Sequence, residues 1–321
     1  MRQFLTLFFL LLCVANKLHA QQDPQYSQYM FNTLVINPAY AGYKETLNLS
    51  GIYRNQWTGV DGAPQTQTLV LDGSFFNDKV GLALGVVNDK SGLIGKFSTY
   101  LNYAYKIPIA NEGILAFGIA AGFSQNSYDA AKATYEQIQN PGFLEGKYNY
   151  IDPDARFGVY FSTNRFYAGL SATNLISSFL SDDDKARRTI ISQANHFFIT
   201  AGYLFDINDF LKCKPSILIK EDTKGPTGID GNLNFLIADK FWIGGAYRSN
   251  VKVFGNTDFI GDTRGSGLVG LIQFVGSTWN VGYSYDYSVS SIKSFNPSHE
   301  ISVGFVLNRK NDFGILSPRY F

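Results

Sequence analysis

The sequence is poor in charge, cysteine and histidine. Only 17% of its 321 residues are charged, against roughly 25% in an average soluble domain, whereas 45% are hydrophobic. Such a composition argues against disorder and against an ordinary soluble surface. The 27 basic and 26 acidic side chains almost balance, so the chain has no large excess of positive charge with which to bind a phosphate backbone. We therefore expect no nucleic-acid partner.

Residues 1–20 have the features of a secretory signal. Arg2 precedes an apolar stretch over residues 4–15, and the small residue Ala20 ends the segment just before Gln21. After Ala20 the chain lacks any apolar run approaching the roughly 18 residues that a membrane-spanning helix needs. A membrane protein built from this chain would have to be a β-barrel.

Removal of this segment leaves Cys213 as the single cysteine and His196 and His299 as the only histidines. An intrachain disulfide or a Cys/His zinc site is then excluded. The acidic run 182–184 lacks the spaced oxygen ligands of a calcium loop and is expected to be a solvated charge run. Ser298 and His299 are adjacent on an expected strand and point to opposite faces, so they cannot act as nucleophile and base. We expect no enzyme activity, no metal and no cofactor.

Aromatic residues and glycine are abundant, with 27 Phe, 20 Tyr and 31 Gly. From residue 45 onward, segments of alternating character are followed by turn signals; Leu69 and Leu71, for example, alternate with Thr68 and Asp72. This repeat predicts an all-β fold, an antiparallel outer-membrane β-barrel of about 14 strands over residues 45–307. The expected strands cover residues 47–57, 68–75, 80–87, 97–107, 115–123, 155–161, 166–172, 197–205, 211–220, 229–237, 241–248, 268–274, 279–287 and 299–307.

The connections alternate between short turns and longer loops, which is typical of the two rims of such a barrel. In a soluble barrel the enclosed face is the apolar one. Here the faces are reversed, because apolar residues form the expected outer face and polar residues the inner one. Six charged residues are expected to face the lumen, where mutual pairing would satisfy them; the lining of a conducting pore is the alternative. They are Arg54, Asp72, Arg156, Arg248, Asp286 and Glu300.

Residues 21–44 interrupt the alternation and are expected to form a periplasmic leader or a plug. Asp23 and Pro24 suit a helix start, and Tyr26, Tyr29 and Met30 then recur at helical spacing. This predicts a short helix ending before residue 37, packed in or under the barrel; an exposed leader is the alternative. Residues 308–321 would be a C-terminal tail.

The opening residues resemble a known family. The runs QDP at 22–24, YSQYMFN at 26–32 and NPAYAG at 37–42 are similar to the opening signature of the PorP/SprF family of type IX secretion system outer-membrane proteins from the Bacteroidota. Further similar runs are YRNQW at 53–57, YDY at 285–287, SHEI at 298–301 and the terminal SPRYF at 317–321. The motif residues expected to contact partners are Asp23, Pro24, Tyr26, Tyr29, Met30, Asn32, Asn37, Pro38, Tyr40 and Gly42.

This resemblance implies a non-enzymatic barrel in the outer membrane, in contact with lipid, that is needed for export or surface docking of adhesin-like cargo with a C-terminal secretion domain. It also implies contact with other type IX secretion and gliding components, including periplasmic ones. Loops 124–153 and 174–195 are the longest connections and are our hypothesis for the cargo-binding surface. The alternatives are an outer-membrane porin or substrate channel and an outer-membrane hydrolase.

Overall fold

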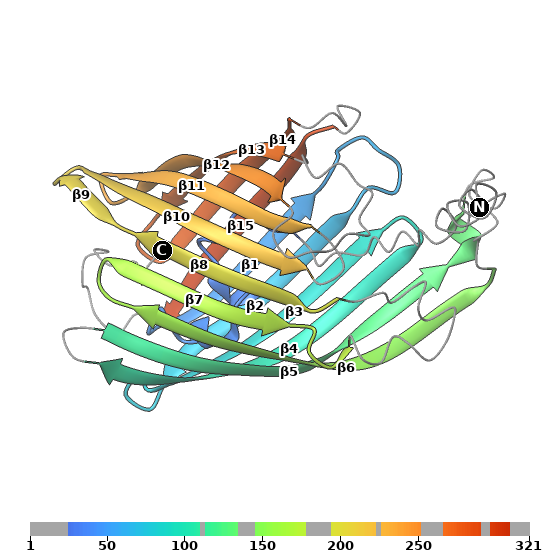
Figure 1. Ribbon diagram of the computed structural model, residues 1–321, viewed down its shortest axis with the longest axis horizontal. Coiled ribbons are helices and arrows are strands. Elements are labelled where there is room, and N and C mark those ends of the chain that lie inside the picture. The colour runs from blue at the N-terminus through green and yellow to red at the C-terminus, as the bar shows by residue number, and fades with distance from the viewer. Residues whose placement is uncertain are drawn as a thin grey trace, which may run out of the picture.

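The fold is a closed antiparallel β-barrel (Figure 1). The computed structural model describes residues 25–109, 113–133, 145–177, 194–222, 226–251, 266–289 and 296–308. Its single sheet has 15 strand segments, but β8 and β9 are consecutive parts of one strand that is interrupted at Leu204, and both pair with β10. The barrel therefore has 14 strands, and the fold predicted from the alternation is confirmed.

The strands follow one another around the barrel in chain order. Their bounds are β1 Leu47–Asn55, β2 Gln65–Phe75, β3 Val80–Ser91, β4 Ile94–Ile109, β5 Gly113–Asp129, β6 Lys147–Ser162, β7 Phe166–Thr173, β8 His196–Tyr203, β9 Phe205–Asn208, β10 Leu211–Asp222, β11 Thr227–Ile237, β12 Phe241–Val251, β13 Ser266–Val275, β14 Trp279–Ser288 and β15 Ser298–Asn308. Three short 3-10 helices complete the described elements: η1 Thr33–Val35, η2 Pro38–Tyr40 and η3 Ala130–Lys132. None of the helices in the described ranges has the length and apolar character needed to cross a bilayer.

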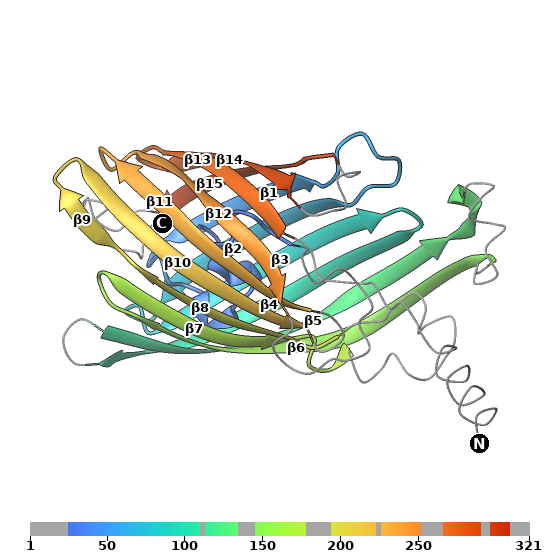
Figure 2. The ribbon, with the colours of Figure 1, turned by 45° about the horizontal axis from the view of Figure 1, so that its top comes forward.

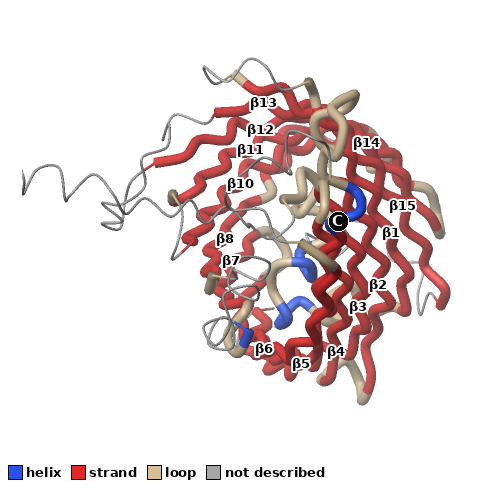
Figure 3. Tube along the Cα trace, turned by 90° about the vertical axis from the view of Figure 1, so that its right-hand side faces the viewer, coloured by secondary structure: helices blue, strands red, loops and turns tan. Residues whose placement is uncertain are grey.

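Pairing between the first and last strands closes the barrel, which Figure 3 shows from one end. The β1–β15 register runs from Leu47 opposite Asn308 to Asn55 opposite His299. Short turns such as 76–79 lie on the rim where β1 begins, and the longer connections lie on the opposite rim. We call these the short-turn rim and the long-loop rim. Closure removes the unpaired sheet edges that could not be satisfied in lipid.

Alternation along each strand separates an apolar outside from a polar inside. On β4, Leu101 and Tyr103 are exposed, whereas Asn102 and Lys106 between and beyond them are buried. The same pattern leaves large apolar side chains exposed on the outer face of other strands, including Leu69, Ile119, Leu170 and Ile272. An apolar outer band of this kind matches the hydrocarbon core of a bilayer.

Several strands are longer than predicted. Residues 88–91 belong to β3, and β5 and β6 extend to Asp129 and back to Lys147, so much of the predicted loop 124–153 is a hairpin. This hairpin projects from the long-loop rim (Figure 2). β5 has 17 residues, whereas a tilted strand needs only about 9–11 to cross a membrane. The excess carries polar residues on both faces, so its alternation was hidden from the sequence analysis.

The N-terminal leader, predicted as a short helix or an irregular segment, is irregular among the described residues and forms no α-helix there. Residues 25–46, which we call the plug, instead form turns and the helices η1 and η2 inside the barrel (Figure 3). Most of their backbone hydrogen bonds are of the i to i−3 type, such as Phe31 N to Gln28 O at 3.0 Å, and one, Asn37 N to Thr33 O at 2.9 Å, is of the i to i−4 type. The barrel wall supplies further hydrogen-bond partners to this backbone, so a regular helix is not required to satisfy it. Residues 1–24 and 309–321, which include the predicted signal and most of the predicted tail, lie outside the described residues.

The outer face predicts a depth-dependent response to charge. Leu101→Arg places a guanidinium midway along β4 and should lower the free energy of unfolding in lipid vesicles by about 2–4 kcal/mol, because the charge must be desolvated in hydrocarbon. Phe76→Arg changes an exposed turn residue on the rim and should cost only about 0–1 kcal/mol. Urea titration of both variants in vesicles measures the difference. Equal losses for the two variants would contradict a membrane that covers the middle of the strands and leaves the rim outside the hydrocarbon.

Candidate functional site

The plug is bound to the barrel wall along its whole length. Tyr29, Met30 and Tyr40 are all at most 5% exposed. Near its centre, the Asn37 side chain accepts a hydrogen bond from Ala39 N at 2.9 Å and donates to Val159 O at 3.2 Å. It thereby both caps η2 and joins the plug to β6.

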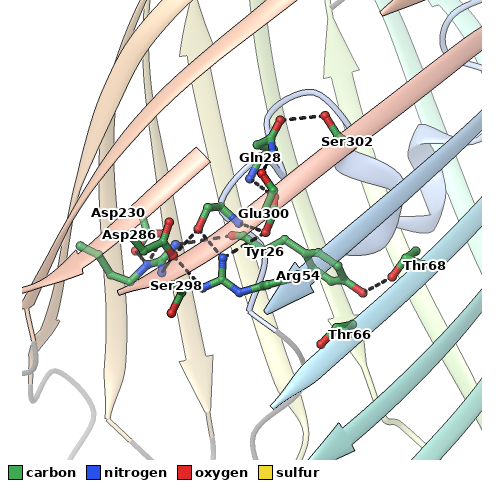
Figure 4. A network of polar contacts seen from close by, with 12 residues as sticks. Tyr26, Gln28, Arg54, Thr66, Thr68, Asp230, Asp286, Ser298, Glu300 and Ser302 are labelled. Carbon is green, nitrogen blue, oxygen red and sulfur yellow. Dashed lines mark hydrogen bonds and ion pairs between the residues drawn. The ribbon is translucent and has the colours of Figure 1, made fainter. Parts of the chain in front are cut away.

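A cluster of polar and charged residues holds the beginning of the plug, and we call it the latch: Ser27, Gln28, Arg54, Asp286 and Glu300. Figure 4 shows Gln28, Arg54, Asp286 and Glu300 of the latch. The Glu300 carboxylate is fully buried and accepts the backbone N–H groups of Ser27 at 2.9 Å and Gln28 at 2.8 Å. Arg54 donates to the same carboxylate at 3.1 Å. Hydrogen bonds to an ionised acceptor are stronger than neutral ones, so this carboxylate fixes the plug backbone against β15.

Arg54 connects the latch to a wider set of charges. It donates to Ser27 Oγ at 2.8 Å and to Asp286 Oδ2 at 2.6 Å. Arg248 lies 3.7 Å from the same Asp286 oxygen and 3.1 Å from Asp230. The network thus alternates in sign around the lumen, and each buried charge has an opposite charge beside it.

A second polar clamp holds the end of the plug at Gly42. Its N–H donates to Asp72 Oδ1 at 2.6 Å, and its carbonyl accepts from Lys106 Nζ at 2.5 Å. Gly42 has a φ of 65°, in the left-handed region that favours glycine. Of the six charges predicted to face the lumen, four therefore lie in the latch network, Asp72 lies in this clamp, and Arg156 is separate, with its guanidinium 3.6 Å from the centre of the Tyr100 ring.

Glycines on the inner face of the wall make room for the plug. A Cβ added to Gly81 would lie 1.8 Å from Ala41 O, and one added to Gly118 would lie 2.1 Å from Ala39 N. Gly158 and Gly282 are similarly close to the side chains of Asn37 and Gln28. We call Gly81, Gly118, Gly158 and Gly282 the glycine track. The sequence analysis missed it, although glycine at inward positions within a strand signals close approach of another backbone.

The eight described motif residues all contact the barrel or pack inside it. Tyr26 and Tyr29 hydrogen-bond to Thr68 at 2.7 Å and to Asn232 at 2.6 Å, and Asn32 donates to Ser50 at 3.3 Å. Met30 packs in a buried hydrophobic cluster, Tyr40 packs edge-on against Tyr160, and Pro38 lies against Gly158. Asp23 and Pro24 lie outside the described residues, and contact of any motif residue with another protein stays a prediction.

The remaining polar groups do not assemble a recognisable catalytic or metal centre in the part of the chain that the structure describes. No group of three or more His, Cys, Asp and Glu residues there could hold a metal ion. Ser298 is buried and accepts from Trp57 N at 3.2 Å, whereas the His299 ring lies on the exposed side beside Tyr283. Residues 182–184 lie outside the described residues.

The latch predicts a large effect from loss of its carboxylate. Glu300→Ala should lower the free energy of unfolding by about 3–5 kcal/mol, because Arg54 and two plug N–H groups would lose a buried partner. Lys147→Ala removes an exposed ion pair with Asp129 and should cost at most about 1 kcal/mol. Denaturant titration in vesicles compares them, and a small loss for Glu300→Ala would contradict the assigned role.

The glycine track predicts a difference between two inward-facing glycines. Gly118→Ala should destabilise the protein by about 1–3 kcal/mol, because its methyl group would overlap the plug backbone at Ala39. Gly85→Ala is the matched control, since its added Cβ would meet no atom within 4 Å, and it should stay within about 0.5 kcal/mol of the wild type. Unfolding midpoints and protease accessibility of the plug distinguish the two. Equal behaviour would show that the plug does not rest on this wall.

Solved structures share the fold at low sequence identity. The CymD monoaromatic hydrocarbon channel is 8% identical with a TM-score of 0.50, over 89% of this chain and 94% of that one. A Pseudomonas aeruginosa FadL homologue is 11% identical with a TM-score of 0.44, over 89% and 95% of the two chains. CdiB from Acinetobacter baumannii is 9% identical with a TM-score of 0.41; the match covers 81% of this chain but only 59% of CdiB. At this identity the likeness to CymD shows the barrel fold alone.

No curated protein matches the sequence. Residues 18–305, in contrast, match the family described as type IX secretion system membrane protein PorP/SprF. The match includes the plug and nearly every strand of the barrel, so the resemblance of the opening residues extends over most of the chain. The chain therefore belongs to the PorP/SprF family of type IX secretion system membrane proteins.

Proposed function

We propose that the protein is a non-enzymatic docking component of the type IX secretion and gliding machinery in the outer membrane of a member of the Bacteroidota. Its cargo would be adhesin-like proteins with a C-terminal secretion domain, held at the long-loop rim outside the cell. The short-turn rim would face the periplasm and contact other secretion components. Residues 1–20 would act as the signal peptide for export.

The observation that carries this proposal is the rigid base of loop 174–195. The buried Asp154 carboxylate accepts hydrogen bonds from Ile176 N at 3.2 Å, Ser177 N at 3.3 Å and Ser177 Oγ at 3.2 Å. Tyr100 adds a fourth at 3.0 Å. One carboxylate on β6 thus fixes the start of the loop to the barrel wall.

The other end of this loop is fixed as well. Asn174 donates to Ala194 O at 3.1 Å, which joins the two ends directly, and its side chain lies 3.1 Å from His196 Nδ1. His196 lies 3.2 Å from the Asp222 carboxylate on β10. Binding surfaces are commonly loops held on a rigid scaffold, since a fixed base lowers the entropy lost on binding.

The plug supports docking rather than free diffusion through the lumen. The described residues 25–46 occupy the middle of the barrel and are bound at both ends by charged groups. A general porin requires a continuous water-filled passage, and in the described part of the chain this segment interrupts it. The projecting β5–β6 hairpin adds a second structured surface on the same rim as loop 174–195.

Loop deletion tests the docking proposal. Replacing residues 178–193 with a short Gly-Ser linker keeps the fixed base and should abolish retention of cargo on the cell surface, because the contact surface is removed. Replacing residues 252–265, a long connection on the same rim, is the matched control and should leave cargo in place. Surface proteomics of both strains measures retention. Unchanged cargo in a correctly folded 178–193 variant would contradict the proposal.

A further inference from the structure

Two cavities lie on opposite sides of one short part of the plug. The first has a volume of about 110 Å³, and the plug lines it with Gln25, Tyr26, Tyr29 and residues 34–36. The second has a volume of about 290 Å³, and the plug lines it with Gln28, Phe31, Asn32 and residues 44–46. Neighbouring residues of the segment 25–32, which we call the partition, therefore face different cavities.

The cavities extend to different rims. The first is lined near the long-loop rim by Asp89, Asp222 and Gly228, at or near the ends of β3, β10 and β11. The second is lined at the short-turn rim by Asp78 and Ser277, in the turns before β3 and β14. Together they cover the height of the barrel, with the partition between them.

The partition and the rest of the plug are held by different interactions. The partition is bound by hydrogen bonds: Ser27 N and Gln28 N to Glu300, the Gln28 side chain to Ser302 at 2.7 Å, and Tyr26 to Thr68. Tyr26, Tyr29, Met30 and Phe31 also pack in a hydrophobic cluster with residues of the wall, and the Gln28 side chain lies against Gly282. The partition therefore combines hydrogen bonds with side-chain packing, whereas Ala39 and Ala41 place backbone atoms directly against Gly118 and Gly81.

We propose that the partition is a gate and that its release joins the two cavities into a passage for ions and small polar solutes. The later plug residues stay in the glycine track during this opening, so the barrel keeps most of its filled interior. The part of the passage nearest the long-loop rim carries charges of both signs, so it discriminates weakly between anions and cations. Its charged lining residues are Lys96, Arg156, Lys220, Asp89, Asp222 and Asp230. This activity is separate from cargo docking and requires no cargo.

Proline substitution in the partition tests the proposal without changing the wall. The double variant Ser27→Pro/Gln28→Pro removes both N–H donors to Glu300 and leaves Arg54, Asp286 and Glu300 intact. Lys147→Ala is the control, because this exposed side chain on β6 lies outside the plug and its contacts. The purified full-length proteins are placed in planar bilayers in potassium chloride, and heat-dependent gel migration checks that each barrel is folded.

We expect little steady current from the wild type and the alanine control, and a mean conductance at least about tenfold larger from the proline variant. A folded proline variant with wild-type conductance would overturn the proposal, as would a wild type that already conducts as well as the variant. If the proline variant does not fold, deletion of residues 25–32 replaces it and is read by the same criteria. Neither result bears on cargo retention, which the loop deletion measures independently.

Discussion

The buried Glu300 carboxylate is the interaction on which the interior of this barrel depends. A barrel of 14 strands encloses more volume than its own inward side chains fill, and polar groups inside it need partners. Glu300 meets this requirement for the wall and the plug together, since it accepts from Arg54 on β1 and from two backbone amides of the plug. The wall charges and the inserted segment are thus satisfied by one another rather than by water.

The remaining contacts of the plug follow from the same close fit. Residues 37–41 lie so close to the wall that strands β3, β5 and β6 have no space for a side chain at the contact. These positions are occupied by Gly81, Gly118 and Gly158. Gly42 then turns the chain towards β1 with its N–H and carbonyl bound by Asp72 and Lys106. The plug is therefore part of the folded barrel, and residues 39–41 differ from its first residues in placing backbone atoms against inward-facing glycines.

This arrangement divides the molecule into regions with separate roles. The outer face meets lipid, the middle is filled, and the long-loop rim has structured features that the opposite rim lacks in the described ranges: the projecting β5–β6 hairpin and a loop base fixed by Asp154. The proposed docking at that rim and the proposed gating in the lumen involve different residues, so they can be altered separately. The family match supports the secretion role, whereas the two cavities are a property of this fold alone.

Much of the architecture could be predicted from the sequence because strand alternation is local. A period of two residues separates Leu101 from Asn102 without knowledge of any other strand, and repetition of that pattern predicts a barrel and its inner charges. The ends of β5 and β6 could not be predicted in this way, because beyond the lipid both faces are polar. A short helix ending before residue 37 was predicted from spacing alone, and no α-helix is found among the described residues there, since the wall supplies hydrogen bonds that a helix would otherwise provide internally.

The sequence by itself therefore determined the fold class, the faces of the strands and, through its opening motif, the family. Only the tertiary structure decided that the motif residues face the barrel, that Arg54 pairs with Glu300 at a distance of 246 residues in the chain, and that inward glycines form a track. The physical reason is that these contacts depend on barrel closure and strand register, which bring together residues from opposite ends of the chain.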